Sequence, residues 1–292
     1  MSSKFINWLI FIALSFIWGS SFILMKEGLV ALTAFQVASL RIISSGLVLF
    51  PVAYRSFKQI PGNKIFYTFM SGVLGSLLPA YLFCVAEQGI DSALAGVLNS
   101  LTPIFVIIIG ALFFQSKTST NKVIGILVAF AGSFLLFLSQ PNFSEHNNAF
   151  YVLLIVIATI MYGINVNMVS RHLKNIPSLQ IASLALSLNA IPALVVLYFT
   201  GYFKLDFSDH AILFSTGFSF VLGIFGTAIA SIIFYMLIKR AGAVFSSMVT
   251  YGIPFVAIMW GIIYGEKIGW KQVICLLIIL TGVYVANRKG NR

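Results

Sequence analysis

The sequence contains the same unit twice. The stretches 92–110 and 243–261 are both apolar, both close to the length that crosses a bilayer, and both contain a proline near the middle. Glycines and prolines recur at a fixed separation of 151 positions: Pro103 with Pro254, Gly110 with Gly261, and Gly75 with Gly226. A constant offset of this length indicates two copies of one unit in a single chain, and such a repeat restricts the fold more than any local pattern.

The repeat extends in both directions, with small shifts of register where loops differ in length. Trp18 matches Tyr162 at an offset of 144, and Gly132 matches Gly282 at an offset of 150. We therefore predict two repeats joined by a short linker on the outer side of a membrane. The first repeat is residues 1–140, the linker is 141–148 and the second repeat is 149–292.

The repeated units are too apolar for a water-soluble core. Hydrophobic residues make up 60% of the chain, charged residues make up 9%, and the mean hydropathy is +1.01. Ten apolar runs are about twenty residues long, which is the length that crosses a hydrocarbon core about 30 Å thick. They lie near 6–25, 34–54, 65–87, 92–114, 122–139, 149–169, 178–200, 212–237, 243–264 and 270–287. The sequence therefore predicts an all-α membrane protein with ten transmembrane helices.

Positive charges fall mainly on one side of the predicted membrane. If the helices alternate from a cytoplasmic N-terminus, thirteen of the 18 Lys and Arg residues lie on the cytoplasmic side, four lie on the other side, and Arg41 lies within a helix. All seven acidic residues fall on the outer side. This is the positive-inside pattern. It predicts cytoplasmic N- and C-termini and a multi-pass membrane protein.

Each unit has an odd number of helices, five, so the two units must enter the membrane from opposite sides. We therefore predict that the repeat is inverted. Inverted repeats are common in secondary transporters, where the substrate site lies near the midplane between the halves. Transport of a small molecule across the lipid bilayer, by a monomer or a homodimer, is the leading functional hypothesis.

Other classes of function lack their sequence signatures. The net charge of +11 follows from the positive-inside pattern rather than from a basic face, so we expect no nucleic-acid partner. The sequence has no zinc-protease pair, nucleophile elbow or phosphate-binding loop. His146, His172 and His210 fall in loops or at helix ends. We therefore expect no enzymatic activity, no cofactor and no metal site.

Polar residues at membrane depth are the candidates for a substrate cavity. Trp18, Arg41 and Asn99 each lie about seven residues from the outer ends of their predicted helices, which is about 10 Å below the surface. The repeat places Tyr162 and Thr250 about as far from the inner surface. The repeat therefore predicts two polar layers, one on each side of the midplane.

Arg41 is the most informative of these residues. A charged side chain within a bilayer is costly unless it is paired or hydrated, so it is a functional candidate by default. Its repeat counterpart is Ala185, which shows that the fold does not need a cation at this point. One hypothesis is that Arg41 binds a substrate carboxylate through its planar guanidinium group. The alternative is that it extends outward and pairs with an acidic residue near the surface: Glu27, Glu87 or Asp91.

Several other residues are predicted to bind substrate, with simple packing as the alternative for each. Trp18 lies too deep for the interfacial belt, so its indole N–H needs a partner or a cavity. Asn165 and Asn167 are two positions apart, so we expect one of them to face inward. The candidates with hydroxyl groups are Ser21, Tyr81, Tyr162, Tyr235, Thr250 and Tyr251. Pro103 and Pro254 are predicted to kink their helices, either as hinges or to adjust packing.

The chain resembles the EamA-type members of the drug/metabolite transporter superfamily over nearly its whole length. The resemblance rests on WGSSF at 18–22, FQVASLR at 35–41, the two proline-containing helices, and the closing segment 265–286. The first repeat departs from the second where Phe114-Gln115-Ser116 stands opposite Gly265-Glu266-Lys267. The resemblance implies a central cavity that opens alternately to each side of the membrane. It leaves the substrate open, because such relatives move amino acids, other metabolites or hydrophobic drugs. It also implies a multi-pass protein of the inner (plasma) membrane, across which such relatives often move their substrates outward.

We therefore expect a secondary transporter of a small amphipathic metabolite, an amino acid or a related carboxylate, by export or facilitated diffusion. Two alternatives remain at this stage: proton-coupled efflux of hydrophobic compounds, and a channel-like pore that does not saturate. Proton coupling needs a titrating group in the path. Glu87 is the deepest acidic residue, and its alternative role is a water-facing helix end.

Overall fold

The structure is a computed structural model that describes residues 3–90, 92–139, 149–263 and 269–288. The predicted linker, residues 141–148, lies outside the described residues, as does Asp91. The elements of the first repeat are α1 (Ser3–Gly28), α2 (Ala34–Phe57), α3 (Gly62–Gly72), η1 (Val73–Leu77), α4 (Leu78–Ala86), α5 (Ser92–Asn99), α6 (Thr102–Phe114) and α7 (Thr120–Leu138). Those of the second are α8 (Ala149–His172), α9 (Ser178–Phe199), η2 (Tyr202–Lys204), α10 (His210–Val221), η3 (Leu222–Ile229), α11 (Ala230–Ala241), α12 (Ala243–Ser247), η4 (Met248–Gly252), α13 (Ile253–Ile263) and α14 (Trp270–Asn287).

The described residues are organised as ten helical spans that are long and apolar enough to cross a membrane. Each of the ten predicted segments coincides with one of these spans, so this prediction is confirmed. Many large apolar side chains are exposed at the surface, among them Phe50, Leu112 and Phe199. Exposed apolar surface on this scale is the expected outer layer of a protein whose solvent is lipid.

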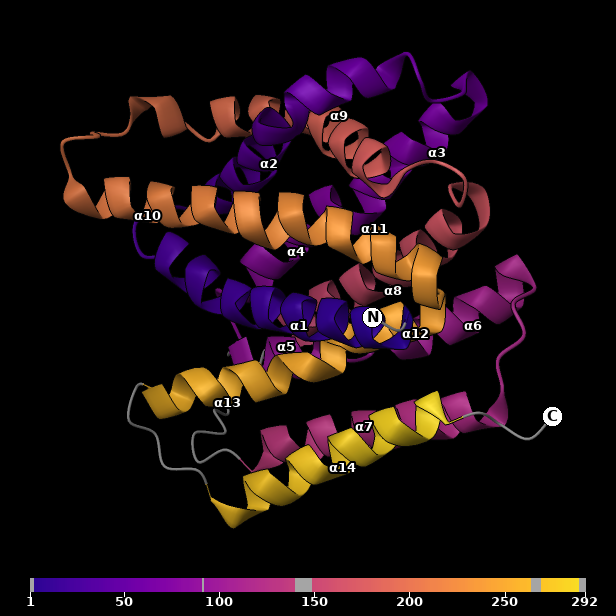
Figure 1. The fold of residues 1–292 in the computed structure, drawn as a ribbon. Helices are drawn as coiled ribbons and strands as arrows, with labels where there is room; N and C mark the ends of the chain where they lie inside the picture. Colours follow the sequence, from indigo (N-terminus) through magenta and orange to yellow (C-terminus); the bar gives the residue numbers. More distant parts are fainter. Residues whose placement is uncertain (1–2, 91, 140–148, 264–268, 289–292) are drawn as a thin grey trace.

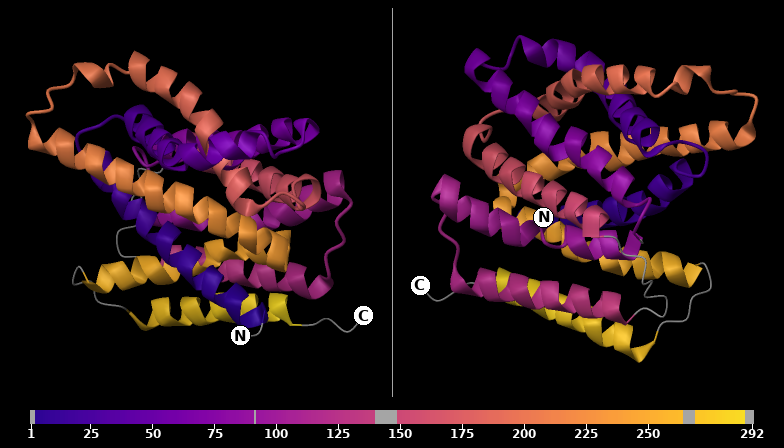
Figure 2. Two further views of the ribbon diagram at one scale, coloured as in Figure 1. Left: turned by 45° about the horizontal axis from the view of Figure 1, so that its top comes forward. Right: turned by 180° about the vertical axis from the view of Figure 1, so that it is seen from behind.

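The spans pack side by side as one bundle (Figure 1). The α7 and α14 helices lie together along one edge, and α2 lies with α9 toward the opposite edge, in all the views of Figures 1 and 2. The start of α1 and the end of α14 lie at the same end of the bundle, as an even number of crossings requires.

Helices at equivalent positions of the two repeats pack against each other through glycines. A Cβ atom at Gly125 of α7 would lie 2.3 Å from the backbone nitrogen of Ala286 in α14, and one at Gly282 of α14 would lie 2.3 Å from the nitrogen of Ala129. In the other pair, the Ser187 hydroxyl of α9 donates a hydrogen bond to the Gly46 carbonyl of α2 at 2.9 Å. These close contacts join the two repeats at both edges of the bundle.

The start of α2 is held by a capping box. The Thr33 hydroxyl accepts from the Gln36 backbone N–H at 3.3 Å, and the Gln36 side-chain oxygen accepts from the Thr33 N–H at 2.9 Å. The Gln36 side-chain amide also donates to the Thr200 carbonyl at the end of α9. This network fixes where α2 begins. It therefore also fixes the position of Arg41 along the helix axis, about two turns after the start of α2.

Four of the ten spans are interrupted, and the interruptions occur at repeat-related positions. The η1 and η3 segments are π-helical and contain Gly75 and Gly226. The helix break after Asn99 and the 3₁₀ segment η4 both precede a proline. The sequence predicted kinks within continuous helices, but Pro103 and Pro254 instead lie in the first turns of new helices, α6 and α13. Proline fits there because the first turn of a helix has no intrahelical acceptor for its missing N–H.

Candidate functional site

A cavity of about 90 Å³ lies where the interrupted spans meet. On the same scale a single water needs about 10–15 Å³, so the cavity is large enough for a small organic molecule. Its polar lining residues are Ser21, Arg41, Ser76, Asn99, Thr102, Asn165, Thr227, Ser231, Ser247 and Thr250. Its apolar and aromatic lining residues are Trp18, Phe22, Met25, Gly75, Phe83, Tyr162, Val166, Gly226, Phe234, Tyr235 and Ile253. The wall is therefore amphipathic, and none of these residues is acidic.

The interruptions of the helices place polar groups at this cavity. Ser76 lies on the π-helical η1 and Thr227 on the π-helical η3, while Asn99 and Thr250 lie at the breaks that precede the two prolines. Wide or broken turns expose backbone that a regular helix would pair internally, which is why they occur often at functional sites. The Trp18 indole N–H donates to one such backbone group, the Gly226 carbonyl, at 3.2 Å.

The glycines of η1 and η3 allow polar side chains of α8 and α1 to approach closely. A Cβ atom at Gly75 would lie 2.2 Å from the Asn165 side-chain nitrogen, and a Cβ atom at Gly226 would lie 2.7 Å from the Ser21 hydroxyl. Ser21 and Asn165 are themselves 144 positions apart, which is the repeat offset of this region. The two halves therefore contribute equivalent contacts to the cavity wall.

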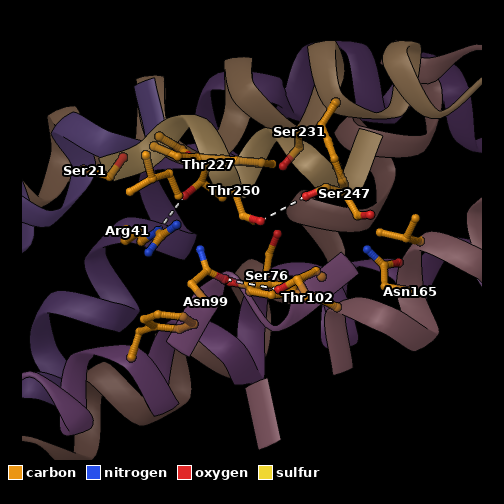
Figure 3. A pocket seen from close by; sticks show the side chains of 18 of the residues that line it. Ser21, Arg41, Ser76, Asn99, Thr102, Asn165, Thr227, Ser231, Ser247 and Thr250 are labelled. Atoms are coloured by element: carbon orange, nitrogen blue, oxygen red, sulfur yellow. Dashed lines mark hydrogen bonds between the residues drawn. The ribbon is translucent and has the colours of Figure 1, made fainter. Parts of the chain in front are cut away.

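Arg41 extends from α2 toward the cavity beside Asn99 (Figure 3). Its Nε atom donates to the Thr227 hydroxyl at 2.7 Å. Within the part of the chain that the structure describes, no carboxylate forms an ion pair with Arg41, and Asp91 lies outside that part. The predicted pairing of Arg41 with Glu27 or Glu87 is therefore not formed, and the guanidinium group faces the cavity instead.

Aromatic rings form the apolar part of the wall. Trp18 packs edge-on against Phe234 with ring centroids 5.0 Å apart, and Phe83 packs against Tyr162 at 6.2 Å. A cavity with one cation, hydroxyl and amide groups, and aromatic faces suits a small molecule that has both an anionic group and an apolar part.

Eight of the ten predicted substrate-binding residues line this cavity: Trp18, Ser21, Arg41, Asn99, Tyr162, Asn165, Tyr235 and Thr250. They meet in one cavity, and the arrangement of its polar groups in two layers about a midplane stays a prediction. Tyr81 and Tyr251 are not among the lining residues. The Tyr81 hydroxyl hydrogen-bonds Ser39 at 2.8 Å, and the buried Tyr251 donates to the Ile126 carbonyl at 2.9 Å within an apolar cluster. Both hydroxyl groups are thus engaged in packing between helices.

Asn165 and Asn167 face different surroundings, as their spacing requires. Asn165 lines the cavity, whereas the Asn167 amide donates to the carbonyls of Val106 and Gly163, both at 2.9 Å. Asn167 therefore closes the contact between α8 and α6.

The repeat register contains a signal for the lining residues that sequence reasoning missed. Eight pairs of lining residues stand at equivalent positions of the two repeats, three at the offset of 144 that relates α1 to α8 and five at the offset of 151. Among them are Ser76 with Thr227 and Phe83 with Phe234, neither of which we had predicted. Applying the offset to every polar residue near Gly75 and Gly226 would have found the first pair.

Glu87 caps the end of α4, outside the cavity lining. It lines a second pocket with Lys26 and Ser92, and its Oε1 atom is buried without a hydrogen-bond partner among the described residues. Burial raises the pKa of the Glu87 carboxyl to about 8, and the smaller effects of the hydrogen bond with Ser92 and the charges of Lys26 and Arg41 oppose this. Glu87 is thus a half-buried helix end outside the wall of the main cavity.

Comparisons with known proteins give one consistent result. A family model described as the EamA-like transporter family matches residues 6–138 and 149–288. An uncharacterized transporter of Archaeoglobus fulgidus is 26% identical over 97% of this chain and 99% of its own. The uncharacterized inner membrane transporter YedA of Escherichia coli K12 is 26% identical over 94% of this chain and 90% of its own. A crystal structure with 16% sequence identity covers 96% of this chain and 95% of its own with a TM-score of 0.73, which shows a shared fold.

Proposed function

This chain belongs to the EamA-like transporter family, and from that membership we propose that it is a secondary transporter of a small amphipathic carboxylate. It is a multi-pass membrane transporter, not an enzyme. The proposed substrate is an amino acid or a related carboxylate, which moves by export or facilitated diffusion across the inner membrane. The relative from Escherichia coli has a name that refers to that membrane.

The observation that supports a carboxylate is the position of Arg41. Its guanidinium faces a cavity without acidic lining residues, and its Thr227 bond leaves most of its five N–H donors for a ligand. A planar fork of donors matches a carboxylate better than it matches a neutral group. The aromatic faces of Trp18, Phe83 and Phe234 supply contacts for the apolar part of the substrate.

The proposed mechanism is alternating access between two inverted halves. Equivalent helices pair across the repeat, and both halves contribute equivalent residues to one cavity. We assign Pro103 and Pro254 as hinges, because each marks a helix break beside the cavity. Helix breaks at the substrate site are typical of transporters in which one repeat moves against the other.

Counterflow of labelled carboxylates in proteoliposomes tests this function. We expect saturable counterflow of at least one small carboxylate, and a loss of about tenfold or more in its affinity in Arg41→Ala, because a hydrogen bond to a charged group contributes about 1.5–3 kcal/mol. Arg41→Lys keeps the charge and loses the fork, so we expect an intermediate affinity. Arg55→Ala is the matched control, since Arg55 lies on the same helix with its side chain exposed.

The other outcomes distinguish the alternatives. Saturable counterflow that persists in Arg41→Ala would retain the transporter and remove Arg41 from its site. Flux without saturation or counterflow would indicate a channel-like pore. Transport of hydrophobic compounds but of no carboxylate would indicate efflux of the drug type.

A further inference from the structure

Ser76 presents a hydroxyl group to the cavity that no described residue satisfies. It lines the cavity from the π-helical η1, and its side chain forms no hydrogen bond within the part of the chain that the structure describes. In that part, the unpartnered side-chain atoms that are closed off from solvent belong to Glu87, Ser133, Asn165 and Asn189. The Ser76 oxygen is therefore open to the cavity, and Figure 3 shows it pointing into the space between the labelled residues.

The repeat gives Ser76 an equivalent hydroxyl that does have a partner. Thr227 follows Ser76 by 151 positions, and its hydroxyl accepts a hydrogen bond from the Nε atom of Arg41 at 2.7 Å. The counterpart of Arg41 at the offset of 144 is Ala185, whose side chain is a methyl group. The second copy of this contact therefore keeps the hydroxyl of Ser76 but lacks the group that would donate to it.

The backbone around the two copies of this contact packs in the same way. Gly72 and Gly223 precede the two hydroxyl-bearing residues by four positions. A Cβ atom at Gly72 would lie 2.7 Å from the Ala185 carbonyl oxygen, and a Cβ atom at Gly223 would lie 2.4 Å from the Arg41 carbonyl oxygen. The two copies thus differ in the side chain that faces the hydroxyl and not in how the helices meet. The protein supplies a donor to the hydroxyl in one copy and leaves it out in the other.

We propose that Ser76 is a specificity-determining residue whose hydroxyl accepts a hydrogen bond from the substrate, as the Thr227 hydroxyl accepts one from Arg41. The substrate is then a carboxylate that also carries an amino or hydroxyl group. This inference rests on the proposed function, in which Arg41 binds the carboxylate. An analogue that lacks the donor binds more weakly, because it takes the Ser76 oxygen out of water without replacing the hydrogen bond. Ser76 therefore selects among carboxylates that Arg41 alone would not distinguish.

The test uses short straight-chain carboxylates in matched forms: unsubstituted, or with an amino, a hydroxyl or an oxo group at each carbon along the chain. Affinities are measured by competition in counterflow and by ligand-dependent thermal stabilisation of the purified protein. We expect wild type to bind the best-placed amino or hydroxyl form about tenfold more tightly than the unsubstituted parent. An oxo group accepts hydrogen bonds but does not donate them, so the oxo forms should bind no more tightly than the parent.

Two substitutions at position 76 separate the hydroxyl from its surroundings. Ser76→Ala removes the hydroxyl oxygen alone, so it should abolish the preference for the amino or hydroxyl form and retain the affinity for the parent. Ser76→Thr keeps the hydroxyl and should keep the preference. Threonine is the residue at the equivalent position, Thr227, so a π-helical segment of this kind accommodates it.

Ser133→Ala is the matched control. Ser133 is also a buried serine whose hydroxyl has no partner among the described residues, but it lies on α7 and does not line the cavity. We expect this variant to keep the wild-type preference. An equal loss of preference in Ser133→Ala and Ser76→Ala would reflect a general effect of removing a buried hydroxyl, and it would overturn the role of Ser76.

The outcomes separate this inference from the proposed function. Equal affinity for the amino, hydroxyl and unsubstituted forms in wild type, with affinity still lost in Arg41→Ala, would overturn the role of Ser76 and leave the transporter of carboxylates intact. An undiminished preference in Ser76→Ala would also overturn it. Tighter binding of an oxo form than of the amino and hydroxyl forms would show that the substrate accepts rather than donates, against the proposal. If no carboxylate of the series competes or stabilises, both proposals are wrong.

Discussion

At the scale of single residues, the informative side chains are those whose surroundings do not match their chemistry. Arg41 has no acidic partner among the described residues, Asn165 has an unpaired oxygen, and the Glu87 carboxyl has a buried oxygen atom. Each of these is costly in a protein whose solvent is lipid. The first two face the cavity, whereas Glu87 lies at the end of α4 beside Lys26 and so provides a separate prediction.

We expect Glu87 to make the stability of the protein fall as the pH rises. Because the folded state raises the pKa of Glu87 from 4.5 to about 8, the folded protein holds this proton where the unfolded chain has released it. The resulting stabilisation is complete below the unfolded pKa and is lost as the pH rises through the folded one. Glu87→Gln mimics the protonated carboxyl and cannot titrate. Melting temperatures measured across this range should therefore fall more steeply for wild type than for Glu87→Gln. Parallel curves would show that Glu87 does not titrate in this way.

Two signals in the sequence predict residues of the site: a polar side chain at membrane depth, and an equivalent position in the other repeat. Arg41, Asn99 and Thr250 were found because they are polar at membrane depth, and Ser76 and Thr227 were within reach of the same register. The sequence does not distinguish Tyr162 and Tyr235, which line the cavity, from Tyr81 and Tyr251, which do not. Which aromatic residues face the cavity depends on the rotation of each helix about its own axis, and packing against neighbouring helices decides that rotation.

At the scale of elements, the sequence predicts where helices lie but not where they are interrupted. The ten apolar runs match the ten spans, since length and hydropathy suffice to find a transmembrane helix. The π-helical η1 and η3 have no comparable signal, because Gly75 and Gly226 alone do not specify a wide turn. Their roles became apparent from the side chains that approach them, Asn165 and Ser21.

We expect the contact between α7 and α14 to be rigid and intolerant of larger residues. A Cβ atom at Gly125 would lie 2.3 Å from backbone of α14, where no side chain is able to move aside. Gly125→Ala should therefore destabilise the protein by about 1–3 kcal/mol, the usual cost of overpacking. Gly217→Ala in α10 is the control. A Cβ atom there meets nothing within 4 Å, so the better helix propensity of alanine should stabilise by up to about 1 kcal/mol.

Reversible unfolding in mixed detergent micelles measures both variants. Equal stability of Gly125→Ala and wild type would mean that α7 and α14 separate easily, which would identify this pair as a moving element. The opposite signs expected for the two glycines make the comparison independent of any general effect of alanine in a helix.

At the scale of the whole molecule, the repeat joins the fold to the proposed function. A family model matches the chain twice, equivalent helices pair with each other, and both halves supply lining residues at equivalent positions. The proposed alternating access rests on this correspondence between the two halves. The sequence predicted two polar layers of a cavity from the depths of single residues, and most of the residues that it named line one cavity.

The inverted orientation of the repeats is itself testable by labelling, and it makes an unusual prediction about equivalent loops. Val30 follows the first span, α1, and corresponds at the offset of 144 to Lys174, which follows the sixth span, α8. Both side chains are exposed. If the repeats are inverted and the N-terminus is cytoplasmic, Val30 faces outward and Lys174 faces the cytoplasm. A cysteine introduced at position 30 should react with an impermeant maleimide in intact cells, and one at position 174 should react only after permeabilisation.

The next pair of loops should show the reverse pattern, which controls for differences in reactivity. Gln59 lies between α2 and α3, on the predicted cytoplasmic side, and Phe203 lies in the corresponding loop between α9 and α10, on the outer side. Both are exposed. The native Cys84 and Cys275 are buried and serve as the unreactive background. If Val30 and Lys174 were labelled from the same side, the two halves would be parallel, and a cavity between halves that open in opposite directions would no longer follow from the repeat. If all four positions instead exchange sides, the inversion stands and the termini lie outside the cell.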